Sequence, residues 1–290
     1  MIVNSDPAPR KSIPAETHIG RVVLRVADLE RAVRFYTRAI GFAEQGRGEG
    51  EAFLGVPGAP LLRLIELPGA PPKPEWATGL SHFAIRVPSR PDLGRVLRHL
   101  IDSGTGLQGA SDHKVSEALY LADPDQNGIE IYRDRPREEW PIQGDRIRMG
   151  TDPLDAEGIL AEAGREGRAF SGLPEGTSMG HMHLQVGDIP TAEAFYVGRL
   201  GFAVVAKMGS ALFVSAGGYH HHIGMNTWTS LGQGPVSGTA GLEAFEIVFP
   251  DTASRDAAVA RVEAAPGAGD GEVPVVKDPW ENAIRLVVAP

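Results

Sequence analysis

The chain repeats itself, and this repeat constrains the fold more than any other feature of the sequence. Residues 24–42 read LRVADLERAVRFYTRAIGF and residues 184–202 read LQVGDIPTAEAFYVGRLGF, with eight of the nineteen positions identical. Each copy predicts a short alternating strand, an Asp that can cap a helix, the helix itself and a Gly suited to its C-terminus. Self-similarity of this kind indicates a fold assembled from copies of one supersecondary unit.

Two weaker copies of the same unit complete the pattern. Residues 80–88 (LSHFAIRVP) and 242–250 (LEAFEIVFP) are strand patterns, and a helical pattern follows each of them. A turn and a last strand then follow, DPDQNGIEIY at 123–132 and DPWENAIRLVV at 278–288. The sequence therefore predicts four βαβββ modules, near residues 18–68, 80–134, 180–228 and 241–288.

The spacing of the modules predicts the domain organisation. We expect an N-terminal tail over 1–17, a first domain over 18–134 that holds modules one and two, and a second domain over 180–290 that holds modules three and four. The intervening residues 135–179 are rich in Pro and Gly and form a predicted connector. One short helix is expected within it, in DPLDAEGILAEAG.

Composition excludes several classes of function. The formal net charge is −9 and no basic tract is present, which argues against nucleic acid and against an anionic membrane surface as partners. There are no cysteines, so any metal must bind His, Asp or Glu. No apolar run approaches a membrane span, and the N-terminus lacks the apolar core of a signal peptide. We therefore expect a soluble, cytoplasmic protein.

These modules resemble a known superfamily. First strands of the HFAIRV type and last strands of the DPDxNGIE type are similar to those of the vicinal oxygen chelate superfamily, which includes glyoxalase I, antibiotic-binding resistance proteins and extradiol dioxygenases. Within it, SDHKVSEALYLADPDQNGIEIYRDRPREEWP and SALFVSAGGYHHHIGMNTW resemble two-domain bacterial catechol 2,3-dioxygenases. The resemblance covers almost the whole chain. It implies an α+β fold in which paired modules form two cupped, barrel-like mixed β-sheets with helices outside.

The resemblance also implies where a metal would bind. Non-haem Fe(II) oxygenases use two His and one carboxylate, and in this superfamily they come from fixed positions on the first and last strands of paired modules. These positions are Arg21, His82, His181 and Ala244 on the first strands and Glu66, Glu130, Met225 and Arg285 on the last strands. Only modules two and three together supply a full set, His82, Glu130 and His181. We expect these two modules to share the working cup, with Fe(II) or alternatively Mn(II) as the cofactor, and modules one and four to form a cup without metal.

Three further residues receive roles from the same resemblance. His221 corresponds to the acid–base histidine of ring-cleaving members, His113 to a residue that hydrogen-bonds a substrate hydroxyl, and Tyr120 to one that holds a substrate oxygen. The histidine run is predicted to lie in a strand, where side-chain alternation places His221 on the face of Met225, with His220 and His222 on the opposite face. Whether His183, His220 or His222 contributes to the site is left open.

The expected function is that of an Fe(II)-dependent extradiol dioxygenase, which opens a catechol-type aromatic diol and incorporates both atoms of O₂. One alternative is a glyoxalase-like metal-dependent isomerase or lyase, which favours a further Glu ligand where Met225 stands. The other is a non-catalytic resistance protein that binds an aromatic compound, and such proteins usually lack the complete triad. The particular catechol and the oligomeric state, including a homo-oligomer, stay open.

Overall fold

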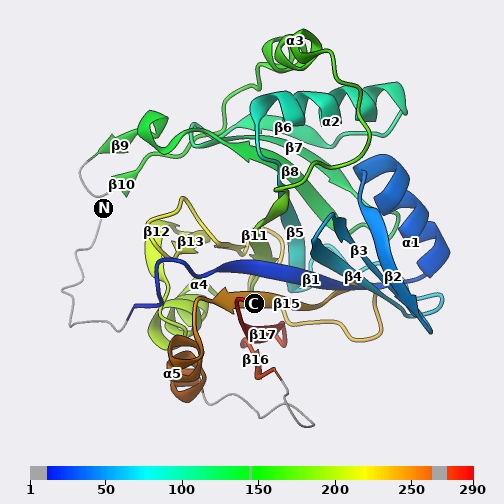
Figure 1. The fold of residues 1–290 in the computed structure, drawn as a ribbon. Helices are drawn as coiled ribbons and strands as arrows, with labels where there is room; N and C mark the ends of the chain where they lie inside the picture. The colour runs from blue at the N-terminus through cyan, green and yellow to red at the C-terminus, as the bar shows by residue number, and fades with distance from the viewer. Residues whose placement is uncertain (1–11, 144–145, 263–272) are drawn as a thin grey trace.

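Two curled mixed β-sheets with helices on their outer faces make up the protein, as Figure 1 shows. The computed structural model describes residues 12–143, 146–262 and 273–290. Most of the predicted tail, residues 1–11, lies outside the described residues. The predicted α+β class with two cupped sheets is confirmed.

The larger sheet has eight strands and joins modules two and three. Their order is β12-β13-β14-β11-β5-β8-β7-β6. Module two contributes β5 (Gly79–Arg86), β6 (Gly109–Asp112), β7 (Ser116–Ala122) and β8 (Gly128–Asp134). Module three contributes β11 (Ser178–Gln185), β12 (Ala203–Met208), β13 (Ala211–Ser215) and β14 (Ile223–Asn226). The first strands β5 and β11 run antiparallel at the centre of this sheet.

The second sheet has seven strands and joins modules one and four, in the order β16-β17-β15-β1-β4-β3-β2. Its strands are β1 (His18–Val26), β2 (Ala43–Gly48), β3 (Glu51–Val56), β4 (Ala59–Glu66), β15 (Gly241–Phe249), β16 (Val275–Lys277) and β17 (Ala283–Val288). The sheet topology confirms the expected pairing of module two with three and of one with four. The division of the chain into units 18–134 and 180–290 stays a prediction.

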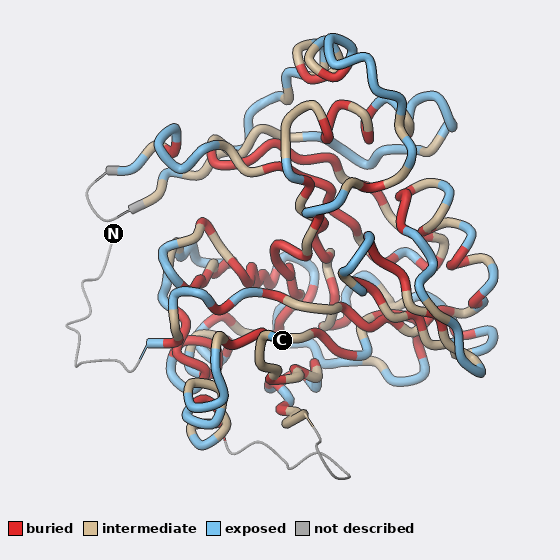
Figure 2. Tube along the Cα trace, in the orientation of Figure 1, coloured by how far each residue is buried: buried red, intermediate tan, exposed pale blue. Residues whose placement is uncertain are grey.

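A helix follows the first strand of each module. These helices are α1 (Leu29–Phe35) with the π-helical η1 (Tyr36–Ile40), α2 (Arg90–Asp102), α4 (Ile189–Glu193) with the π-helical η3 (Ala194–Arg199), and α5 (Thr252–Val262). Asp28 and Asp188 cap α1 and α4 through their side chains, as the repeat predicts. The apolar faces of helices and sheets meet in a core that includes the central strands, which are coloured as buried in Figure 2.

Two buried tyrosines link modules that the sheets leave apart. The Tyr36 hydroxyl, in module one, donates to Asp123 Oδ2 in the last turn of module two at 2.8 Å. The Tyr196 hydroxyl, in module three, donates in the same way to Asp278 Oδ2 of module four at 2.9 Å. Because the sheets join modules two with three and one with four, these two contacts connect all four modules into one structure.

The connector is more structured than the sequence indicates. The helix expected in it is α3 (Ala156–Glu166), which lies against α2 (Figure 1), where Arg95 Nη1 donates to Glu166 Oε2 at 2.6 Å. The connector also forms the short 3-10 helix η2 (Arg137–Glu139) and the strand pair β9 (Ile142–Gln143) and β10 (Arg146–Ile147), which were not predicted. Among the described helices, none has both the length and the apolar character that crossing a membrane requires.

Candidate metal centre

The three predicted ligands converge at the centre of the eight-stranded sheet. His181, His82 and Glu130 lie on the adjacent strands β11, β5 and β8. His82 Nε2 is 3.0 Å and His181 Nε2 is 3.1 Å from the same oxygen, Glu130 Oε2. One ligand atom from each residue lies within 4.8 Å of the others. Three ligand atoms this close together could bind a single metal ion.

Strand register explains why these side chains meet. β5 and β8 are parallel, with Ala84 opposite Glu130, so the carboxylate lies beside the strand that carries His82. β11 runs antiparallel to β5. The register of this pair shifts between Met179 and His181, and again between His183 and Leu184. Such shifts mark β-bulges, which change the direction of side chains along a strand. The bulges therefore help to bring His181 toward Glu130.

The polar atoms of the triad fit a divalent cation. His82 Nε2 is buried and has Glu130 Oε2 at 3.0 Å without a well-aligned hydrogen bond, and His181 Nδ1 is buried with no hydrogen-bond partner within the described part of the chain. Burial raises the pKa of Glu130, but the neighbouring His181 and His82 outweigh it, and the pKa lies well below its usual range. Burial lowers the pKa of His181. An anionic carboxylate beside a neutral imidazole is the protonation state that metal binding requires.

Tyr120 lies beside His82 of the triad and His113 contacts Tyr120, and the roles expected for both stay a prediction. Tyr120 on β7 stands directly across from Glu130 on β8. His113 Nδ1 lies 2.8 Å from the Gly150 carbonyl oxygen and must donate to it, because a carbonyl only accepts. In neutral His113 the other nitrogen, Nε2, then accepts from the Tyr120 hydroxyl at 2.6 Å. Burial raises the pKa of Tyr120, which keeps the phenol neutral. The contribution of Gly150, in the connector, is not visible in the sequence.

The histidine run does not form a strand, so the alternation expected for it is wrong. β14 begins only at Ile223, after the run has ended. His221 nevertheless reaches the triad, with its ring centroid 4.1 Å from that of His181. Met225 is fully buried in the apolar core. The residue of β14 that lies beside the site is Gly224, which pairs with His183. A Cβ added to Gly224 would come within 3.1 Å of His183 Nδ1.

The other two histidines of the run differ from each other. His220 is fully buried, and its Nδ1 lies 2.9 Å from His221 Nδ1, so the expectation that it points away from His221 is wrong. Its Nε2 lies 2.8 Å from Asp134 Oδ1. His222 instead accepts the backbone N–H of Ala216 through Nδ1 at 3.1 Å. His220 therefore contacts the site through His221, whereas His222 holds the backbone of the loop at Ala216.

His183 is near the triad without joining the group of candidate ligands. Its ring centroid lies 4.8 Å from that of His82 and 5.7 Å from that of Trp228. Asn226 Nδ2 lies 2.9 Å from His183 Nε2 and donates to it. Since that nitrogen's lone pair is already used, His183 forms part of the wall of the site.

Asp134 is the site residue that the sequence reading missed. It lies on β8 four residues after Glu130, and side chains at this spacing share one face of a strand. That periodicity is the signal that could have found it.

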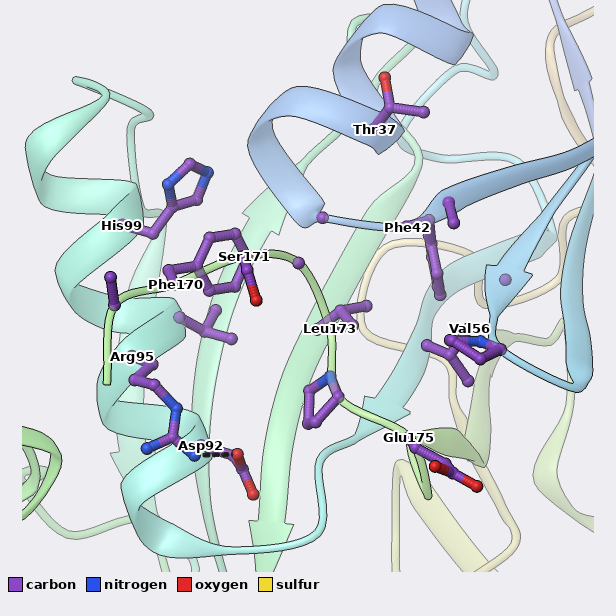
Figure 3. Close-up of a pocket in the computed structure, with 18 of the residues that line it drawn as sticks. Thr37, Phe42, Val56, Asp92, Arg95, His99, Phe170, Ser171, Leu173 and Glu175 are labelled. Atoms are coloured by element: carbon purple, nitrogen blue, oxygen red, sulfur yellow. Dashed lines mark hydrogen bonds and ion pairs between the residues drawn. The ribbon is translucent and has the colours of Figure 1, made fainter. Parts of the chain in front are cut away.

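A cavity of about 620 Å³ lies elsewhere, between the end of η1, α2 and residues 168–175, and none of the triad residues lines it (Figure 3). His99 stacks on Phe170 there, with ring centroids 4.1 Å apart. Arg95 is paired with Asp92 and with Glu166. Arg95 and Asp92 thus already have ion-pair partners. The cavity is separate from the candidate metal centre.

Comparison with known proteins defines the class first. The model of the Glyoxalase/Bleomycin resistance protein/Dioxygenase superfamily matches residues 18–131 and 178–285. The chain belongs to this superfamily, which confirms the resemblance seen in the sequence.

Particular relatives narrow the comparison. The chain is 45% identical over 262 residues to a catechol-2,3-dioxygenase of Bacillus subtilis (strain 168), covering 88% of this chain and 90% of the relative. A crystal structure of a protein from the same species superposes with a TM-score of 0.68 at 12% identity, covering 96% of this chain and 86% of the other. Glyoxalase I from Zea mays gives a TM-score of 0.56 at 17% identity, with 94% and 92% covered. At these identities the two structures show the fold alone.

Proposed function

We propose that the protein is an extradiol dioxygenase that cleaves a catechol-type aromatic diol with O₂ and uses Fe(II), held by His82, Glu130 and His181. The observation that carries this proposal is the convergence of two imidazoles and one carboxylate on adjacent strands. The 45% identity to a catechol-2,3-dioxygenase over most of both chains supports the same reaction. Two nitrogens and one oxygen leave further positions of a metal free for substrate and O₂.

Each residue around the triad has a task in this reaction. A bound Fe(II) would supply Lewis acidity and a template for the two catechol oxygens. His221 would take a proton from one catechol hydroxyl as the neutral imidazole and return it later as the imidazolium. Burial lowers the pKa of His221 well below its usual range, which keeps it neutral before the substrate arrives. Tyr120 would accept a hydrogen bond from a substrate hydroxyl through its phenol oxygen, and His113 would bind the substrate once its Nε2 exchanges the Tyr120 hydroxyl for a substrate hydroxyl.

The walls of the cup suit an aromatic ring. Phe213 packs edge-on against His221, with centroids 5.2 Å apart, and Trp228 lies beside His183. Trp228 is 63% exposed, so a large apolar face is open to solvent next to the site. An aromatic substrate could cover this face, since stacked or edge-on aromatic pairs are favourable.

The test is reconstitution of the purified, metal-free protein with Fe(II) under anaerobic conditions. Addition of catechol and air-saturated buffer should give a yellow ring-opened product, with one O₂ consumed for each catechol. Parallel reconstitution with Mn(II) decides between the two metals, which suit the same ligands. Stoichiometric metal without product from any catechol tested would favour an isomerase or binding function instead. Absence of metal binding would remove the site altogether.

A further inference from the structure

A chain of three side chains runs from the edge of the site into the protein. His221, whose ring is against His181, lies 2.9 Å from His220 through their Nδ1 atoms. His220 Nε2 lies 2.8 Å from Asp134 Oδ1. His220 is fully buried, while the Asp134 side chain is 22% exposed. The structure thus places a carboxylate next to His220, and His220 next to His221, the residue proposed as the acid–base group.

The proton positions in this chain follow from what each atom can do. A carboxylate only accepts, so the proton between Asp134 and His220 belongs to His220 Nε2. In the neutral form of His220 the single N–H is the one at Nε2, so its Nδ1 is an acceptor. The contact between the two Nδ1 atoms therefore requires the proton to be on His221. His221 is left with an unprotonated Nε2.

Asp134 is held as an ionised anchor for this arrangement. The Tyr219 hydroxyl lies 3.0 Å from both Asp134 oxygens and donates to them, and the Tyr132 hydroxyl lies 2.6 Å from that of Tyr219. Arg86 Nη1 is 3.3 Å from Asp134 Oδ2. Burial raises the pKa of Asp134, but His220 and Arg86 outweigh it and the pKa is lowered.

The backbone next to the metal centre makes room for this anchor. A Cβ on Gly180 would lie 1.7 Å from the Tyr132 hydroxyl oxygen, a distance no side chain could tolerate. Gly180 is the residue directly before His181. The chain therefore keeps glycine where a side chain would displace Tyr132 from Tyr219, and through it Tyr219 from Asp134.

We propose that Asp134 and His220 are positioning residues that fix His221 as the Nδ1–H tautomer, so that its Nε2 is the base for the substrate. The proposal rests on the proposed function for what the base acts on, and the tautomer itself does not depend on it. When catechol ionises, its O–H bond breaks, the electron pair stays on oxygen, and the proton forms an N–H bond at His221 Nε2. The imidazolium keeps its Nδ1–H bond to His220, and Asp134 stabilises the positive charge through that histidine.

The first measurement reads the tautomer directly, without turnover. Full-length, metal-free protein labelled with ¹⁵N in histidine is studied by long-range ¹H–¹⁵N correlation at neutral pH, with His221→Phe used to assign the signals. We expect His221 Nδ1 to have the shift of a protonated nitrogen and Nε2 that of an unprotonated one. The opposite pattern in the wild-type protein, or a rapid mixture of both forms, overturns the proposal.

Variants test whether His220 sets this tautomer. His220→Phe removes the acceptor and should give a mixture of His221 tautomers. His220→Asn can place an amide oxygen near the original Nδ1 and should restore the single form. His222→Asn is the matched control, because it keeps an acceptor for the Ala216 N–H and should leave the signals of His221 unchanged. An unchanged His221 tautomer in folded His220→Phe contradicts the proposal.

Kinetics of the Fe(II)-loaded proteins provide the last arm. His220→Phe should lower kcat by about 10- to 100-fold, less than loss of the acid–base group itself, with KM and iron content little changed. His220→Asn should recover most of this loss. If the wild-type protein has the expected tautomer but cleaves no catechol, the proposed function fails and the tautomer assignment stands. If wild-type turnover is normal and kcat of His220→Phe is unchanged, the positioning role fails and the proposed function stands.

Discussion

The two sheets have the same strand arrangement but carry different side chains at equivalent positions. Each places two first strands antiparallel at its centre, β5 with β11 in one and β1 with β15 in the other. Each then adds a parallel last strand, so that Ala84 pairs with Glu130 in the first sheet and Glu246 pairs with Arg285 in the second. Where one sheet gathers imidazoles around a carboxylate, the other gathers guanidinium groups around one.

The second sheet places two positively charged side chains beside its carboxylate. Arg21 Nε and Arg285 Nε lie 3.9 and 3.7 Å from Glu246 Oε1, and the Arg21 backbone N–H donates to Glu246 Oε2 at 3.0 Å. Arginine has only donors and no lone pair to offer, so it cannot ligate a cation. The comparison teaches that the fold brings equivalent strand positions together in both sheets, and that the residue types there decide which sheet offers possible metal ligands.

The largest effect is expected from replacing the central carboxylate of each sheet by an amide. Glu130→Gln removes the only carboxylate of the candidate triad, and we expect loss of stoichiometric iron and of detectable ring cleavage. Glu246→Gln is the same change at the carboxylate of the other sheet and should retain both. Iron per chain, measured by elemental analysis after anaerobic reconstitution and gel filtration, decides the outcome. Iron retained by Glu130→Gln, or lost from Glu246→Gln, would show that the metal site has been assigned to the wrong residues.

Much of this comparison could be predicted from the sequence, for a physical reason. The residues of a repeated unit occupy equivalent places, so once the family resemblance supplied the ligand positions, the residue types on the first and last strands were enough to choose modules two and three over the other pairs. His82, Glu130 and His181 lie within binding distance of one another, as that choice requires. Their role as metal ligands stays a prediction, as do the roles of His113, Tyr120 and His221.

Irregular segments were the part that the sequence did not reveal. The strand rule failed at residues 220–222, because the chain there forms a loop held by contacts with Asp134 and Ala216. The last-strand position of module one was also misread. Glu66 accepts the backbone N–H of Leu29 through Oε1 at 3.0 Å, at the start of α1, while Arg63 pairs with Val23 at the centre of the sheet. Long-range contacts of this kind have no periodic signal.

The second prediction separates metal binding from chemistry within the eight-stranded sheet. His221→Phe removes the proposed acid–base group but none of the triad, so iron content and KM should stay near wild type. Turnover at saturating catechol and O₂ should fall about 10²- to 10⁴-fold, the usual cost of a lost general acid–base group. A wild-type rate in this variant would exclude His221 from the reaction. The comparison with His222→Asn controls for nonspecific effects of altering the run.

The third prediction concerns a feature that both halves of the chain share. Tyr36→Phe and Tyr196→Phe each delete a hydroxyl that donates to a buried carboxylate, Asp123 or Asp278. Each loss should cost about 1–3 kcal/mol of the free energy of unfolding, because the remaining acceptor is buried. Urea unfolding of the metal-free proteins measures this, since bound metal would add its own stabilisation. Losses that differ between the two variants by more than about 1 kcal/mol would mean that the two contacts are not equivalent.

The smallest expected effect is that of the charges of the seven-stranded sheet on stability. Glu246→Gln keeps an oxygen that can accept the Arg21 backbone N–H and loses only the ion pairs to two arginines that are about one-third exposed. Exposed pairs of this kind contribute about 1 kcal/mol or less, and salt weakens them further. Urea unfolding at low and high salt should therefore show a small loss for Glu246→Gln that shrinks as salt is added. A loss of several kcal/mol that salt does not change would mean that Glu246 is needed to hold the second sheet together. In that case the arginines would be structural replacements for a metal, and the difference between the two sheets would lie in how each is stabilised as well as in what each can bind.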